Sequence, residues 1–277
     1  MRNHRALRAF GGVLAAALIA LAFLPSDVAL AQVGQPGGVT EEAQSMHRLY
    51  LVVVGMAFAV FFGVVGALLF ALVRYRRRRP DEPLPSQIHG SAKIEILWVS
   101  IPIVIVLTLF TYSAVVLAKV DRKADPEALT VHVQGFQFQW RFTYDLRDLG
   151  TRSPVDQDGT ISILGTPSNE PELVIPVGEP VEFVLESSDV IHSFYVRDFL
   201  YKLDVIPGLE NRFVVKPVKT GVYRGQCAEL CGVDHALMRF TVRIVTRDEF
   251  DAWIREQVAA QAREQGGGSP LAVTDSR

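Results

Sequence analysis

Apolar residues are distributed differently in the two parts of the chain. Near the N-terminus they form long unbroken runs, and two of these, at about residues 49–73 and 94–117, are long enough to cross a bilayer as α-helices. An earlier run, GGVLAAALIALAFL, is shorter, follows a basic segment and precedes an Ala-Leu-Ala sequence at residues 29–31. We interpret residues 1–31 as a signal peptide that is cleaved before Gln32, and the alternative is a first membrane helix.

Residues 32–120 are therefore expected to form a two-helix transmembrane hairpin. Between the helices lies RYRRRRPDEPLP, in which five arginines follow the first helix directly. Positive residues beside a spanning helix stay in the cytoplasm, so both ends of the mature chain face outward. A nucleic-acid-binding patch is the alternative for this run, and its position against a membrane helix argues against nucleic acid as a partner.

From Lys119 onward apolar residues alternate with polar ones in short runs that are separated by Pro and Gly. Such runs predict β-strands, here LTVHVQGFQFQWRFTY, PELVIPVGEPVEFVLES, IHSFYV, NRFVVKPVKTGVYRG and MRFTVRIVT. Many short strands within about 125 residues predict a Greek-key sandwich or barrel over residues 121–246. Residues 247–277 predict a terminal helix followed by a disordered tail.

Composition supports a membrane protein, and the net charge of the C-terminal part bears on its partners. A hydrophobic fraction of 49% with a mean hydropathy of +0.22 is high for a soluble enzyme. The stretch from Lys119 to the end carries 18 Lys and Arg against 24 Asp and Glu, a formal charge of −6. An acidic outer domain favours encounter with a basic partner, although the same charge also promotes solubility.

The only two cysteines lie in QCAELCGVDHALM, residues 226–238, with a His and a Met behind them. Two cysteines outside the cytoplasm normally form a disulfide, which leaves these neighbours unexplained. Zinc accepts two thiolates and an imidazole but does not require a methionine. Soft thiolate, thioether and imidazole ligands favour copper, and two thiolates one short loop apart can bridge two copper ions. A further imidazole is expected from His192 in another strand, with His132 as the rival.

The run CAELCGVDHALM resembles the dinuclear copper (CuA) motif Cys-x-Glu-x-Cys-x-x-x-His-x-x-Met of the cytochrome c oxidase subunit II family. SSDVIHSF resembles the upstream segment that supplies the first His of that motif, and KLDVIPGLENRF and GVYRGQ are also similar to the family. The resemblance covers nearly the whole mature chain. It implies a membrane-anchored all-β fold class, in which a cupredoxin-like Greek-key β-barrel follows the two-helix hairpin.

The resemblance also implies a role for each residue of the motif. His192 and Met238 would complete one copper and His235 the other, while Cys227 and Cys231 bridge both ions. Glu229 matches the position whose backbone carbonyl contacts the copper that His235 holds. In the family its carboxylate also reaches a magnesium ion that is shared with subunit I, and a carboxylate oxygen suits that hard cation.

Aromatic residues alternate through GFQFQWRFTY and are therefore expected to share one strand face, most of them as core: Phe136, Phe138, Trp140, Phe142 and Tyr144. The segment is similar to the family pattern Gly-x-Gln-Trp-x-Trp, whose first Trp receives the electron from cytochrome c. That position is Phe138 in this chain, and Trp140 keeps the second. This departure is consistent with a different docking geometry for the donor, such as a tethered or membrane-anchored cytochrome.

Glu95 lies at the expected cytoplasmic start of the second helix. A carboxylate in a first turn is favoured by the helix dipole, which is the structural explanation. The family pattern Glu-x-x-Trp matches Glu95 and Trp98. In the family this Glu lies at the mouth of a proton path into subunit I.

The resemblance implies an electron-transfer subunit of an oxidase enzyme complex, which accepts electrons from cytochrome c and passes them to haem in subunit I, where dioxygen is reduced to water. The implied partners are subunit I, the other oxidase subunits, a soluble or anchored cytochrome c and a copper assembly chaperone. The implied location is the bacterial cell membrane, crossed twice, with the copper domain on the outer face, periplasmic or extracellular.

Other functions fit the sequence less well. A quinol oxidase subunit II shares the architecture but lacks the copper ligands, and nitrous oxide reductase needs a propeller domain for which this chain has no room. The alternative that stays open is a membrane-anchored copper-binding or chaperone module without electron transfer.

Overall fold

The structure is a computed structural model that describes residues 34–77, 79, 87, 90–125, 128–145, 159–166 and 169–266. The predicted signal peptide at residues 1–31, most of the loop after the arginine cluster and residues 267–277, which make up all but the first residue of the predicted tail, lie outside the described residues.

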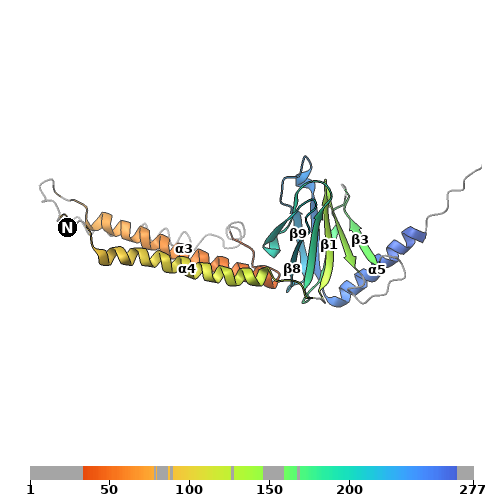
Figure 1. Cartoon of the computed structure of the whole chain (residues 1–277), viewed down its shortest axis with the longest axis horizontal. Helices are drawn as coiled ribbons and strands as arrows, with labels where there is room; N and C mark the ends of the chain where they lie inside the picture. The colour runs from red at the N-terminus through yellow and green to blue at the C-terminus, as the bar shows by residue number, and fades with distance from the viewer. Residues whose placement is uncertain are drawn as a thin grey trace, which may run out of the picture. The chain divides into compact units, whose positions relative to one another are not determined.

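Two long helices, α3 (Glu41–Arg74) and α4 (Ala92–Val120), are apolar and long enough to cross a membrane (Figure 1). Both exceed the predicted apolar runs. The first turn of α3 is polar and begins earlier because the Thr40 side chain accepts a hydrogen bond from the Ala43 N–H (3.1 Å). Apolar length therefore predicts the spanning part of each helix but not the ends that lie beyond it.

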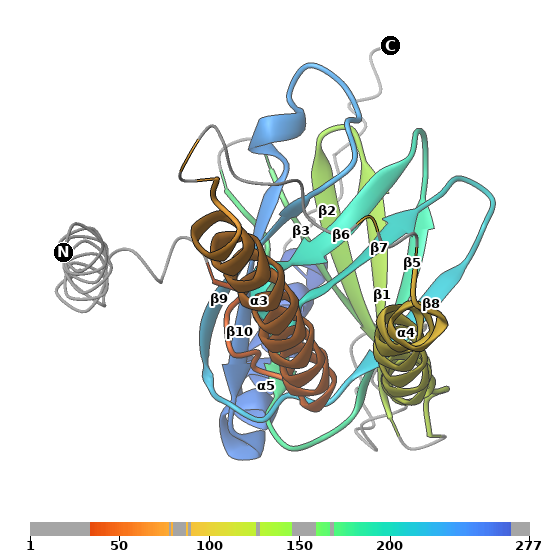
Figure 2. The same cartoon turned by 90° about the vertical axis from the view of Figure 1, so that its left-hand side faces the viewer.

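The C-terminal part of the described chain is a β-sandwich of two five-stranded sheets. Figure 2 shows β9 and β10 on one side and β1, β5 and β8 on the other. The strand order is β3-β2-β1-β5-β8 in the first sheet and β4-β10-β9-β6-β7 in the second. The strands are β1 (Leu129–Phe136), β2 (Gln139–Asp145), β3 (Thr160–Leu164), β4 (Glu172–Pro176), β5 (Val181–Ser187), β6 (His192–Val196), β7 (Tyr201–Val205), β8 (Asn211–Val215), β9 (Gly221–Cys227) and β10 (Arg239–Val245).

Two strand pairs are parallel, β1 with β5 and β10 with β4, and the others are antiparallel. Parallel neighbours cannot be joined by a tight turn, so the chain passes repeatedly between the two sheets. This arrangement agrees with the predicted all-β sandwich and brings loops that are distant in sequence to one end of it.

The structure corrects one predicted strand and adds two. The aromatic run was expected to form a single face, but Gln137 and Phe138 make a two-residue turn between β1 and β2, which pair with Phe136 opposite Gln139. Phe136 and Phe138 are thereby removed from the face that buries the other three aromatic residues. The strands β3 and β7 were not predicted, and both lie at sheet edges, where a strand needs fewer apolar residues.

The aromatic core packs against the cysteine loop, residues 228–238 between β9 and β10. Phe240 stacks on Phe194 with ring centroids 4.8 Å apart, and Trp140 meets both rings edge to face. Gly225 is required below them, since a Cβ there would collide with the Phe240 ring. All of these side chains are buried, so the floor of the loop is rigidly packed.

The last helix, α5 (Arg247–Gly266), contacts the sandwich through Phe250 and Trp253. Both rings contact Tyr144, whose hydroxyl donates to the Val174 carbonyl (3.0 Å) and accepts from the Val174 N–H (2.9 Å). These contacts connect β2 of the first sheet to β4 of the second.

A buried carboxylate connects the start of α3 to the sandwich. Glu42 is 2% exposed; it accepts hydrogen bonds from the Arg122 guanidinium and from the Lys216 backbone N–H, both at 2.9 Å. Lys119 adds a hydrogen bond to Ser45 (3.0 Å). The ends of both helices and the end of β8 are therefore held by one small polar cluster.

Candidate metal centre

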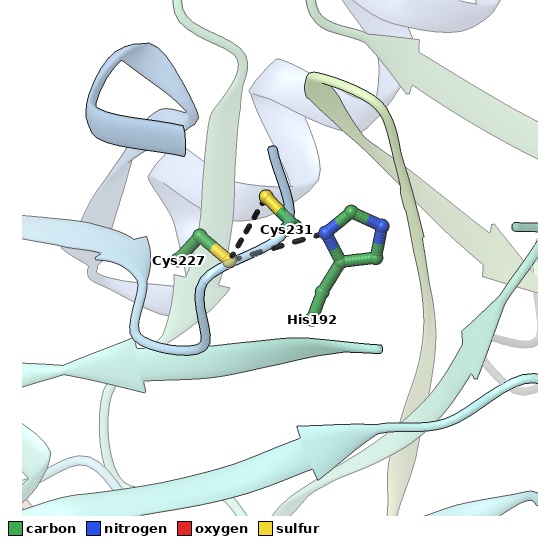
Figure 3. Close-up of side chains that lie close together, drawn as sticks. All are labelled: His192, Cys227 and Cys231. Atoms are coloured by element: carbon green, nitrogen blue, oxygen red, sulfur yellow. Dashed lines mark hydrogen bonds between the residues drawn. The ribbon is translucent and has the colours of Figure 1, made fainter. Parts of the chain in front are cut away.

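Three chain segments meet at the end of the second sheet. His192 is the first residue of β6, Cys227 is the last of β9, and the loop that follows carries Cys231, His235 and Met238. The antiparallel pairing of β6 with β9 sets Phe194 opposite Cys227, which brings His192 beside the loop. Figure 3 shows His192, Cys227 and Cys231 converging, and their ligand atoms all lie within 4.8 Å of one another.

The loop is closed by main-chain hydrogen bonds. The Cys227 N–H donates to the Met238 carbonyl (2.9 Å), and the Ala228 N–H donates to the Ser193 carbonyl (3.0 Å). The short 3-10 helix η2 (His235–Leu237) then turns the chain back towards β10. These bonds hold Cys227 and Met238 side by side although eleven positions separate them.

Sulfur and nitrogen atoms surround one small space. The two cysteine Sγ atoms are 3.9 Å apart, and the Cys231 Sγ is 3.9 Å from the Met238 Sδ. The Nδ1 atom of His192 lies 3.9 Å from the Cys227 Sγ, and that of His235 lies 3.6 Å from the Cys231 Sγ. Both cysteines are free, so the predicted disulfide alternative does not describe this structure.

These separations fit ligands of shared metal ions. Two ligand atoms on one tetrahedral metal ion, with bonds of about 2.0 to 2.3 Å, lie roughly 3.3 to 3.8 Å apart. The observed separations of 3.6 to 3.9 Å are close to that range without movement of the backbone. Two thiolates, a thioether and two imidazoles form a soft ligand set, which favours copper over magnesium or calcium.

Asp189 fixes the orientation of the His192 ring. Its Oδ1 lies 2.8 Å from the His192 Nε2, which places the ring proton on that nitrogen and leaves the Nδ1 lone pair facing Cys227. Burial disfavours the charged imidazole, but the hydrogen bonds with Cys227 and Asp189 outweigh it and raise the pKa of His192. Burial likewise acts to raise the pKa of Asp189, and hydrogen bonds from Gln137, His192 and Val190 lower it overall.

The two thiols differ in acidity. Burial acts to raise the pKa of Cys227, but contacts with His192 and with nearby backbone groups prevail and lower the pKa to about 7. Burial and the neighbouring Cys227 charge raise the pKa of Cys231 to about 12. One thiolate is therefore available near neutral pH, and a bound cation would promote ionisation of the second.

The remaining predicted site residues occupy different surroundings. The Glu229 backbone carbonyl accepts a hydrogen bond from the Cys227 thiol at 3.2 Å, and Glu229 is exposed. His132 is exposed on β1, in the opposite sheet, so the structure places His192 and not His132 at the cysteines. Glu95 is exposed in the first turn of α4, where its carboxylate accepts a hydrogen bond from the Ser91 N–H (3.2 Å).

The aromatic residues are divided between core and turn. Trp140 is fully buried, and its Nε1 lies 3.5 Å from the Met238 carbonyl. Phe138 is partly buried in the β1–β2 turn, against Gly232 of the cysteine loop.

Two further residues at the site were not predicted, Asp189 and Gln137. A carboxylate three positions before His192 could have suggested the first, whereas only the folded loops reveal the contact that Gln137 makes with Cys231.

Comparison with known proteins identifies the family. Residues 30–116 match the family model of the cytochrome c oxidase subunit II transmembrane domain, and residues 129–245 match that of its periplasmic domain. A probable cytochrome c oxidase subunit 2 of Streptomyces avermitilis is 35% identical over 251 residues, which cover 81% of this chain and 79% of the relative. The chain belongs to the cytochrome c oxidase subunit II family. The cytochrome c oxidase subunit 2 of Mycobacterium bovis is 31% identical and covers 94% of this chain and 86% of its own length.

Similar solved structures include the periplasmic domain of the oxidase subunit II of Bradyrhizobium japonicum, which is 33% identical with a TM-score of 0.41 and covers 51% of this chain and 99% of that one. Another is a mixed-disulfide intermediate between a thioredoxin-like protein and a subunit II domain, at 30% identity and a TM-score of 0.40, covering 52% of this chain and 98% of that one.

Family membership confirms the predicted fold class and function. The chain is a membrane-anchored subunit of an oxidase enzyme complex, with an electron-transfer role and a cupredoxin-like outer domain. Its partners are other subunits of that complex, and it is a two-pass membrane protein whose sandwich lies on the outer face.

Proposed function

We propose that the cluster of sulfur and nitrogen atoms holds the dinuclear copper centre through which this subunit transfers electrons. The observation that carries the proposal is the pair of free cysteine sulfurs, 3.9 Å apart, with an imidazole Nδ1 beside each. Cys227 and Cys231 would hold both ions, His192 and Met238 would complete one site, and His235 with the Glu229 carbonyl would complete the other. The exposed Glu229 carboxylate is then free to bind magnesium at the boundary with subunit I.

The surroundings of the ligands suit electron transfer. A copper pair held by these residues would supply one-electron transfer, because an electron shared over both metals would change each metal–ligand bond little. His192 and Met238 are both fully buried, and Cys227 and Cys231 are 3% and 6% exposed. The packed core around these four ligands excludes water and resists movement, which keeps the energy of reorganisation small, while His235 is half-buried. All of the ligand positions are supplied by the chain, which suits an electron carrier rather than a site that binds substrate.

Cytochrome c is the proposed donor. Electrons enter through the β1–β2 turn, where Phe138 lies between the solvent and the cysteine loop, with Trp140 buried behind it. Haem in subunit I is the acceptor. Glu95, exposed at the start of α4, is the proposed mouth of a proton path into subunit I.

Copper loading and location complete the proposal. Two free thiols in an oxidising compartment need protection until the metal arrives, so a copper assembly chaperone is a proposed partner. The proposed location is a bacterial cell membrane. Residues 1–31 are proposed as the signal peptide, 32–120 as the hairpin, 121–246 as the copper domain and 247–277 as a helix with a tail.

Copper content and electron paramagnetic resonance test the copper centre. The full chain is purified in detergent, reduced, loaded with copper and partly oxidised. Two coppers per chain with hyperfine splitting shared by both nuclei are expected, and His132→Ala, which changes the exposed rival histidine, should behave like the wild type. A single copper with localised splitting would refute the dinuclear centre and favour a copper-carrying module without electron transfer.

A further inference from the structure

The turn between β1 and β2 is hydrogen-bonded to two of the ligand-bearing segments. The Gln137 backbone N–H donates to Asp189 Oδ2 (2.7 Å), while Asp189 Oδ1 lies 2.8 Å from the His192 Nε2. The Gln137 side-chain amide donates to the Cys231 carbonyl (2.6 Å). A continuous chain of hydrogen bonds therefore runs from the His192 ring through Asp189 and Gln137 to the backbone of Cys231.

Close packing accompanies these bonds. A Cβ added to Gly232, which follows Cys231 with a φ of +143°, would lie 2.8 Å from the Phe138 ring and 3.1 Å from the Gln137 amide nitrogen. A Cβ added to Gly135 would lie 3.1 Å from the His192 ring. Glycine at both positions lets the turn approach the ligand segments more closely than another residue would permit.

We propose that Gln137 and Asp189 are positioning residues that hold the His192 ring and the Cys231 backbone in one fixed relation for the metal. The inference rests on the proposed copper centre and deepens it, because neither residue is a ligand. It also gives the β1–β2 turn a second role. The segment proposed to receive electrons is part of the frame that sets the ligand geometry, so disturbance of the turn changes the centre itself.

A neighbouring glutamine provides a matched control. Gln134 lies on β1 and donates to the Ser188 hydroxyl (2.7 Å), while its carbonyl oxygen accepts from Arg141 (2.6 Å). It therefore contacts the segment that carries Asp189, as Gln137 does, but its other partner lies on β2 and not in the cysteine loop. Gln134→Glu and Gln137→Glu introduce the same charge into the same hairpin, but only the second removes a donor to the Cys231 carbonyl.

The test compares the copper-loaded full chain in detergent for wild type, Gln137→Glu, Asp189→Asn and Gln134→Glu. Replacement of residues that orient metal ligands typically weakens metal binding about 10- to 100-fold. We expect Gln137→Glu and Asp189→Asn to lose copper to a chelator at least about 10-fold faster than the wild type, and Gln134→Glu to stay within about twofold. Asp189→Asn should also raise the midpoint potential, because His192 becomes a weaker donor to the oxidised metal.

The outcomes distinguish failure of this proposal from failure of the proposed copper centre on which it rests. If the wild type binds two coppers and both variants retain copper and potential as it does, positioning by Gln137 and Asp189 is refuted while the copper centre stands. If the wild type binds no copper pair, both proposals are refuted. Circular dichroism of the metal-free chains establishes folding, and should Gln137→Glu fail to fold, Asp189→Asn decides the question.

Discussion

Replacement of Glu42 by Ala should strongly destabilise the outer domain, because this carboxylate is buried. The side chain is almost completely buried and accepts two hydrogen bonds. Its loss leaves the Lys216 N–H without a partner, which costs about 1–3 kcal/mol, and removes a charge-assisted bond worth about 1.5–3 kcal/mol. Arg122 is 36% exposed and regains water, so the second contribution falls towards its lower limit. We expect a total of about 2.5–4.5 kcal/mol.

Urea unfolding of the full chain in detergent, followed by tryptophan fluorescence, measures this loss. With a slope of about 2 kcal/mol per molar, the midpoint should fall by about 1–2 M. Glu172→Ala is the matched control, since that carboxylate pairs with Arg243 but is 41% exposed, and an exposed pair contributes at most about 1 kcal/mol. If Glu42→Ala lowers the midpoint no further than Glu172→Ala does, the reasoning from burial is wrong.

Three further predictions concern the proposed site. In the metal-free reduced chain the Cys227 thiol should ionise near pH 7, below the ordinary value of about 8.5. Because folding lowers the pKa of this thiol, its thiolate stabilises the folded chain above pH ~8.5, and that stabilisation is lost as pH falls through about 7. Ultraviolet thiolate absorbance measures the midpoint, and a value above about 8.5 contradicts the proposed contacts with His192. Cys231→Ser should leave one copper per chain with localised hyperfine splitting, and retention of two would exclude bridging. Glu95→Gln should lower turnover of the assembled oxidase with an unchanged copper spectrum, and unaltered turnover would remove Glu95 from the proton path.

The sequence was informative where structure is local. Apolar length marks both spanning helices, and the loop ligands lie within twelve consecutive residues. His192 was harder to predict because its place depends on the pairing of β6 with β9. The turn at Gln137 and Phe138 was missed because the alternation of aromatic residues continues through it without a Gly or Asn at the turn itself. Asp189 and Gln137 join the site through contacts between loops, which no periodicity encodes.

The late position of the ligands in the chain has a consequence for biogenesis. The cysteine loop is held by β9 and β10, and β10 is itself completed by parallel pairing with β4, more than sixty positions earlier. Pairings between distant segments form slowly, since a long loop must close before they gain any stability. The ligands therefore cannot take their places until residue 245 has been exported and the sandwich has closed. Copper insertion is expected to be the last step of maturation, and an interrupted or truncated chain should reach the outer face as a protein without metal.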